Sequence, residues 1–158
     1  MKEKSILITH ATHPVIQRLY KSIGENFQSL FKGDSQDFPS LLEASGYQKL
    51  PDASHSSYPH LILDACLTLD VDYFLPLASA EVKALQGAEV MFAEYGIQVL
   101  MPNEPYLNAG LISVMPSKGD AVQLFEKGQS LNGAASLSEA QSGLFFLHEG
   151  KDWKAILL

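Results

Sequence analysis

The sequence predicts a three-layer α/β fold in which helices cover both faces of a mainly parallel sheet. Short apolar runs rich in β-branched residues alternate along the chain with longer segments of helical periodicity. Strands that alternate with helices are typical of right-handed β-α-β crossovers, and therefore of parallel strands. The runs expected to form this sheet are residues 5–9, 27–31, 71–77 and 97–101.

The composition is that of a globular protein. A length of 158 residues is usual for one domain, and 46% of the residues are hydrophobic. The net charge is −7 and no basic cluster is interleaved with aromatic residues, which argues against nucleic-acid binding. The single Cys66 excludes an internal disulfide and a zinc site built from cysteines. No apolar run has the length of a membrane span and no signal segment precedes the first strand, so we expect a cytoplasmic protein without a membrane partner.

Two helices of the first half are predicted by their apolar spacing and their end residues. The first covers residues 14–24, where Pro14 falls in the first turn, whose N–H needs no partner, and Gly24 ends the helix. The second begins at Pro59 and continues to Leu69, because apolar residues recur there at helical spacing.

The connection between these helices is mostly polar. Lys32-Gly33-Asp34 is predicted to be a turn, because glycine and aspartate favour turn positions. Residues 40–44 are expected to form a short helix. Residues 47–51 are expected to form a brief edge strand, since Pro51 has no N–H to donate to a sheet.

The second half begins with a long amphipathic helix over residues 79–95, ended by Gly96. After it we expect a helix at 118–127, a polar loop at 128–138 and a hairpin with strands at 143–147 and 153–158. The sequence thus predicts an α/β domain at 1–115, with a C-terminal helix and hairpin at 116–158 packed on it. Because the hairpin is strongly apolar, we expect it to add to the sheet edge and the chain to form a homodimer.

A ligand-binding crevice is predicted where polar residues follow the first and third strands. The candidate residues are Thr9, His10, Thr12, His13, Ser79 and Glu81. Ligands of open α/β sheets bind at the carboxyl ends of strands, near the point where the strand order reverses, and helix N-termini there favour an anion. The alternative is local: Thr12 or His13 caps the following helix, and Glu81 interacts favourably with a helix dipole.

The sequence predicts no catalytic residue, no metal site and no cofactor. His10 and His13 lack the i, i+4 spacing that places two imidazoles together on a helix. Asp34 lies where a dinucleotide-binding domain keeps an acid for ribose, but G-x-G-x-x-G is missing, which favours a turn aspartate. Neither a P-loop nor a nucleophile elbow is present. Cys66 falls in the apolar set of its helix and is expected to be an inert core thiol.

A family resemblance rests on one stretch of the sequence. It consists of a strand ending in Leu75-Pro76, an acidic residue at Glu81, a long helix, and the strand Gly96–Pro102. With the opening strand SILIT, residues 4–112 resemble the N-terminal pre-ATP-grasp domain of carbamoyl-phosphate-synthase-like and other ATP-grasp proteins. The resemblance implies a Rossmann-like fold. It does not carry over catalysis, since the first loop, His10–His13, lacks the family's glycines, and the nucleotide-site residues are absent from this sequence.

These observations predict a non-catalytic pre-ATP-grasp-like domain, either the front end of an ATP-grasp carboxylate–amine ligase or a stand-alone relic. Ligase activity would belong to the chain only as a fragment of a larger protein. The alternative is a stand-alone regulatory α/β module that binds a small anion or metabolite in the crevice. A Rossmann-type nucleotide-cofactor enzyme is disfavoured by the missing glycines, so we expect no ATPase activity and no tight binding of ATP or NAD.

Overall fold

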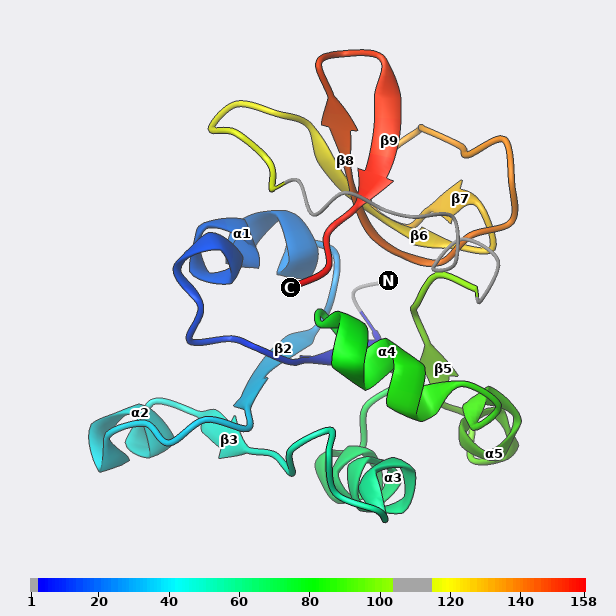
Figure 1. The fold of residues 1–158 in the computed structure, drawn as a ribbon. Helices are drawn as coiled ribbons and strands as arrows, with labels where there is room; N and C mark the ends of the chain where they lie inside the picture. The colour runs from blue at the N-terminus through cyan, green and yellow to red at the C-terminus, as the bar shows by residue number, and fades with distance from the viewer. Residues whose placement is uncertain (1–2, 104–114) are drawn as a thin grey trace.

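The computed structural model describes residues 3–103 and 115–158 (Figure 1). The helices in these ranges are α1 (Pro14–Gly24), α2 (Ser40–Ala44), α3 (Tyr58–Leu69), α4 (Ser79–Leu85) and α5 (Glu89–Glu94). The strands are β1 (Ser5–Ile8), β2 (Ser29–Asp34), β3 (Tyr47–Lys49), β4 (Tyr73–Leu75), β5 (Gln98–Val99), β6 (Val122–Glu126), β7 (Gln129–Ser130), β8 (Gly143–His148) and β9 (Asp152–Ala155). None of the described helices is long and apolar enough to cross a membrane.

Five strands form a parallel sheet in the order β3-β2-β1-β4-β5. The chain moves outward from β1 through β2 to β3, and then returns past β1 to form β4 and β5 on the other side. The strand order therefore reverses between β1 and β4, which makes the carboxyl ends of these two strands the topological switch point. The predicted mainly parallel sheet is confirmed, and each of its four predicted strands overlaps one of these strands.

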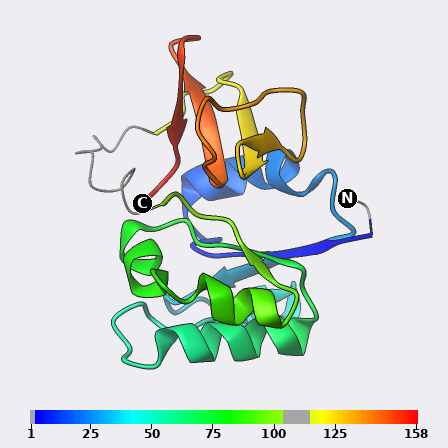
Figure 2. The same ribbon diagram turned by 90° about the vertical axis from the view of Figure 1, so that its right-hand side faces the viewer.

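The parallel sheet is the middle layer of the fold, and its side chains enter two apolar cores (Figures 1 and 2). Successive side chains of a strand point to opposite faces. Ile6 and Ile8 of β1 therefore pack with α1 and the C-terminal strands, whereas Leu7 packs with α3, α4 and α5. Because both faces are covered, β1 is apolar at consecutive positions. The prediction of helices on both faces is confirmed.

The turn expected at Lys32-Gly33-Asp34 is wrong, because these residues are the last three of β2. They pair in parallel with β3, which is an edge strand as predicted. Gly33 is needed because the Leu50 side chain packs closely against it, and not because the backbone turns there. A Cβ added there would lie 2.3 Å from Cδ1 of the buried Leu50, and in a strand a glycine often marks such a contact.

The helix expected over residues 79–95 is interrupted, so its predicted length is wrong. Gly87, between α4 and α5, has a φ of +82°, a left-handed conformation that glycine adopts readily and that a right-handed helix does not contain. Both short helices still bury apolar residues under the parallel sheet: Val82 and Leu85 from α4, and Phe92 from α5.

The helix expected at 118–127 is also wrong, because residues 122–126 form β6. This strand is central in a four-stranded antiparallel sheet of order β7-β6-β8-β9. Its successive side chains are buried on opposite faces: Leu124 faces the core of α1, whereas the ring of Phe125 contacts Phe145 and Trp153 edge-on, with centroids 5.7 and 5.3 Å apart. These contacts between distant residues outweigh the local helical spacing.

β8 and β9 confirm the predicted hairpin, but its expected position at the edge of the parallel sheet is wrong. The hairpin pairs with β6 instead and packs over α1 and one face of the parallel sheet (Figure 2). The end of the chain then returns to the switch point. The Leu158 N–H donates to the Leu77 carbonyl over 2.7 Å, and the Ser79 N–H donates to the Leu158 carbonyl over 2.9 Å.

Candidate functional site

A cavity of about 260 Å³ lies at the switch point, and we call it the switch-point crevice. Its lining residues are His10, Ser35, Asp52, Ala53, Ser54, Ala78, Ala80 and Glu81. They come from segments that follow the carboxyl ends of β1, β2, β3 and β4. The cavity is therefore where an open parallel sheet of this order places its ligands.

Thr9 and Glu81 form a buried hydrogen-bonded pair behind this cavity. The Thr9 Oγ1 hydroxyl donates to Glu81 Oε1 over 2.5 Å and accepts the Leu77 N–H over 2.8 Å. Only 1% of Thr9 and 4% of Glu81 is exposed. Since Thr9 follows β1, and Leu77 and Glu81 follow β4, the hydroxyl connects the two strand ends. It thereby fixes the orientation of a carboxylate that lines the crevice.

His10 faces the same carboxylate from the loop after β1. Its Nε2 lies 3.5 Å from Glu81 Oε2. The pKa of His10 is raised above its ordinary value of 6.5, because Glu81 acts as hydrogen-bond acceptor and negative charge, and Asp34 and Asp52 add negative charge; together these effects outweigh burial, which lowers the pKa. His10 also has a φ of +52°, a left-handed conformation that costs a residue with a Cβ roughly 1–2 kcal/mol.

Asp34 anchors the loop after β1 from the end of the neighbouring strand. Its Oδ2 accepts the Thr12 N–H over 3.0 Å and the Thr12 hydroxyl over 2.5 Å, and its Oδ1 accepts the Gln36 N–H over 3.0 Å. Burial alone would raise the pKa of Asp34, but these hydrogen bonds and the nearby His10 outweigh it and lower the pKa. The predicted turn aspartate is therefore a strand-end residue, although its bond to Gln36 has the local form of an Asx turn.

The six predicted crevice residues separate into two groups. His10 and Glu81 line the cavity and Thr9 holds Glu81. Thr12 instead binds Asp34, and His13 caps α1 through Nδ1, which accepts the Val15 N–H over 3.2 Å. Ser79 is not among the described residues that line the cavity. His13 therefore acts as a helix cap, as in the local alternative. Glu81 instead lines the crevice.

The sequence did not indicate two further residues near the crevice, Asp52 and Tyr58. Asp52 lines the cavity from the loop after β3, and its Oδ1 accepts the N–H and the hydroxyl of Ser54 over 2.9 and 2.6 Å. Tyr58 is fully buried. Burial, the negative charge of Glu81 and the approach of the Tyr58 hydroxyl to Glu81 raise the pKa of Tyr58, although no hydrogen bond of ordinary geometry forms between them. If β3 had been treated as a further parallel strand, Asp52, in the loop after it, would have been expected at the same edge of the sheet.

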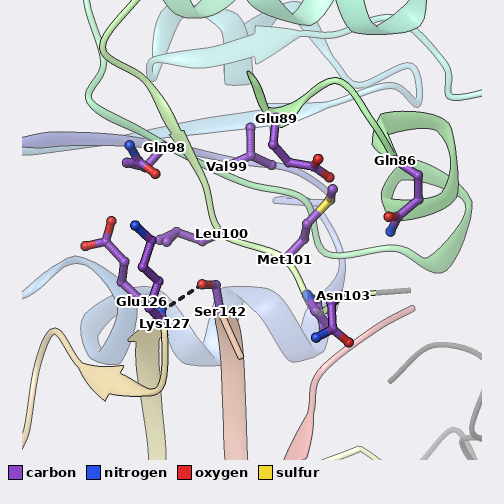
Figure 3. A pocket seen from close by; sticks show the side chains of 11 residues that line it. Gln86, Glu89, Gln98, Val99, Leu100, Met101, Asn103, Glu126, Lys127 and Ser142 are labelled. Atoms are coloured by element: carbon purple, nitrogen blue, oxygen red, sulfur yellow. Dashed lines mark hydrogen bonds between the residues drawn. The ribbon is translucent and has the colours of Figure 1, made fainter. Parts of the chain in front are cut away.

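A second cavity of about 290 Å³ lies between β5 and the antiparallel sheet (Figure 3). Figure 3 shows Gln98 and Glu89 on one side and Glu126 and Lys127 on the other. The Lys127 N–H donates to Ser142 Oγ over 2.9 Å. The charged side chains that line this cavity are half-buried or exposed.

Within the described parts of the chain, no group of three or more His, Cys, Asp and Glu side chains is arranged to hold a metal ion. Comparisons of the chain with protein-family models and with curated proteins gave no match. The geometry of the crevice is therefore the basis for the function proposed below.

Proposed function

We propose that this chain is a non-catalytic α/β module that binds a small polar molecule in the switch-point crevice. The observation that carries the proposal is the buried Glu81 carboxylate, held by Thr9 and paired with His10 at the edge of the cavity. A buried charge is costly and is retained where paired groups or a function compensate for it. The network joins the two strand ends at which ligands of such sheets bind.

The size of the cavity limits the ligand. About 260 Å³ is just below the roughly 300–1,000 Å³ of cavities that hold drug-sized ligands. This volume fits a metabolite of a few heavy atoms and is too small to enclose a dinucleotide.

We also propose the pre-ATP-grasp-like origin that the sequence resemblance implies, with the chain acting either as the front end of a carboxylate–amine ligase or as a relic. The parallel sheet supports this origin at the level of fold only. A native reading frame that continues into a glycine-rich, lysine-bearing segment would establish the ligase alternative, and its absence would favour the relic.

Two further proposals concern where and how the chain acts: in the cytoplasm, and as a homodimer. Cys66 is buried and unpaired, in keeping with a reducing compartment. Light scattering after size-exclusion chromatography tests the dimer: a mass near twice the 17.3 kDa of the chain is expected, and a mass near 17.3 kDa would contradict it.

The binding proposal is tested by a thermal-shift screen of the chain against amino acids, amines, nucleotides and phosphorylated metabolites. A ligand present at 100 times its Kd should stabilise the fold by about 2.7 kcal/mol. The stabilisation should be lost in Glu81→Gln and kept in Glu89→Gln, a matched change in the second cavity. A ligand that stabilises both variants equally would contradict the proposed site.

A further inference from the structure

We infer that the switch-point crevice takes a small organic cation, whose primary ammonium group binds at the Glu81 carboxylate in exchange for the proton of His10. The inference deepens the proposed function and rests on it, because it names the ligand class of the same cavity. It replaces the small anion expected from the sequence.

The charges around the crevice favour a cation. Glu81 and Asp52 line the cavity, and Asp34 acts on His10 from the end of β2. No lysine or arginine occurs among the described lining residues, so His10 is the lining side chain there that can carry a positive charge. An anion would meet carboxylates of its own sign, whereas an ammonium group would meet complementary charge.

Glu81 also has acceptor capacity on the cavity side. Thr9 occupies Oε1, while the approach of His10 to Oε2 is 3.5 Å, longer than an ordinary hydrogen bond. An ionised carboxylate has about four lone-pair sites. The fully buried Tyr58 hydroxyl also approaches Glu81, but it forms no hydrogen bond of ordinary geometry and therefore competes little for the carboxylate. The cavity side of the Glu81 carboxylate can therefore accept a further donor.

Binding of the cation is coupled to the proton on His10. The groups that act on His10 are Glu81 on α4, Asp34 at the end of β2 and Asp52 after β3. Protonated His10 partly neutralises Glu81 and competes with the ammonium group. Affinity should therefore rise by up to about tenfold per pH unit below the pKa of His10 and level off above it, and by reciprocity a bound cation lowers the pKa of His10.

The experiment follows the His10 imidazole by NMR through a pH titration of the whole chain. The probes are ethylammonium chloride, neutral acetamide and sodium acetate, at constant ionic strength maintained with sodium chloride. We expect ethylammonium to lower the pKa of His10, and to bind more tightly as the pH rises. Binding of ethylammonium that does not depend on pH, or an unchanged His10 pKa at saturating ethylammonium, would overturn the inference.

The probes separate failure of the inference from failure of the proposed function. If acetamide or acetate moves the His10 signals and ethylammonium does not, the crevice binds small molecules but not cations. In that case the inference fails and the proposed function stands. If none of these probes, and no compound of the thermal-shift screen, moves the His10 signals, both fail.

Asp52→Asn is the informative variant, because Asp52 is exposed and its loss should leave folding intact. We expect it to weaken ethylammonium binding about three- to tenfold through lost charge complementarity. The matched control is Glu89→Gln, which removes one negative charge at the second cavity and should leave binding unchanged. Equal weakening by both variants would show a general effect of net charge and would overturn the inference.

Discussion

The switch-point crevice and the second cavity have similar volumes, about 260 and 290 Å³, but they are built differently. The crevice is lined by segments that follow four strands of one sheet, and a buried carboxylate is held there by a buried threonine. The second cavity lies where two sheets meet, and its charged side chains are half-buried or exposed. Volume alone does not distinguish them. The buried and oriented carboxylate does, and it is the reason why we propose the crevice as the site.

The largest expected difference between the two regions comes from removing one hydroxyl in each. Thr9→Val keeps the side-chain shape, but it leaves the buried Leu77 N–H and Glu81 Oε1 without the partner they share. We expect the free energy of unfolding to fall by about 2–4 kcal/mol, because buried groups left unsatisfied are costly. Urea denaturation measures this change.

Ser142→Ala is the matched change at the second cavity, where the lost bond is that of the exposed Lys127 N–H. It should lower the free energy of unfolding by about 1 kcal/mol or less. If Thr9→Val proved no more destabilising than Ser142→Ala, the Thr9–Glu81 pair would not be the structural centre of the crevice.

A smaller effect is expected from pH. Because the pKa of His10 is raised in the folded chain, the folded state binds that proton more tightly than the unfolded state. Its contribution to stability should be fully present below pH 6.5, the ordinary pKa, and should be lost as pH rises through the raised pKa. Urea denaturation of the chain across this range measures the loss.

His10→Asn supplies the control, because asparagine tolerates the left-handed conformation of this position and does not titrate. The difference in stability between the chain and this variant should shrink as pH rises. Asp34 has the opposite pH dependence. Its pKa is lowered in the folded chain, so the stability that it contributes is present at neutral pH and is lost as pH falls through the lowered pKa. A difference that stays constant across the His10 range would show that the pair with Glu81 contributes no pH-dependent stability.

The smallest expected effect is that of Tyr58→Phe. The buried hydroxyl of Tyr58 approaches Glu81 without a hydrogen bond of ordinary geometry, so its removal breaks no strong bond. We expect the free energy of unfolding to change by less than about 0.5 kcal/mol, or to rise. A destabilisation above about 1 kcal/mol would mean that the hydroxyl has a strong partner in solution.

The parallel half of the fold was predictable from the sequence because its signals are local. Continuous apolar strands such as β1 alternate with helices that have clear ends, and Gly24 and Pro59 mark two of these ends. The antiparallel sheet was only half predictable. The hairpin has a turn signal, but β6 is defined by contacts of Leu124 and Phe125 with residues far along the chain. Periodicity within residues 118–127 does not contain that information.

The position of the crevice was predictable because the carboxyl ends of parallel strands lie at the same edge of a sheet. That rule brought Thr9, His10 and Glu81 together correctly in space. It did not indicate Asp52, which follows a strand of three residues, or Tyr58, whose position depends on how α3 packs. The proposed change of ligand from an anion to a cation also required the structure, because helix N-termini suggested an anion while the carboxylates that surround His10 favour a cation.

The most direct test of the crevice as the binding site is a crystal of the chain soaked in turn with ethylammonium chloride, acetamide and sodium acetate. We predict ordered density for at least one probe beside Glu81, between His10 and Asp52, with ethylammonium giving the highest occupancy. Density for these probes only in the second cavity, against Gln98 or Lys127, would contradict the account.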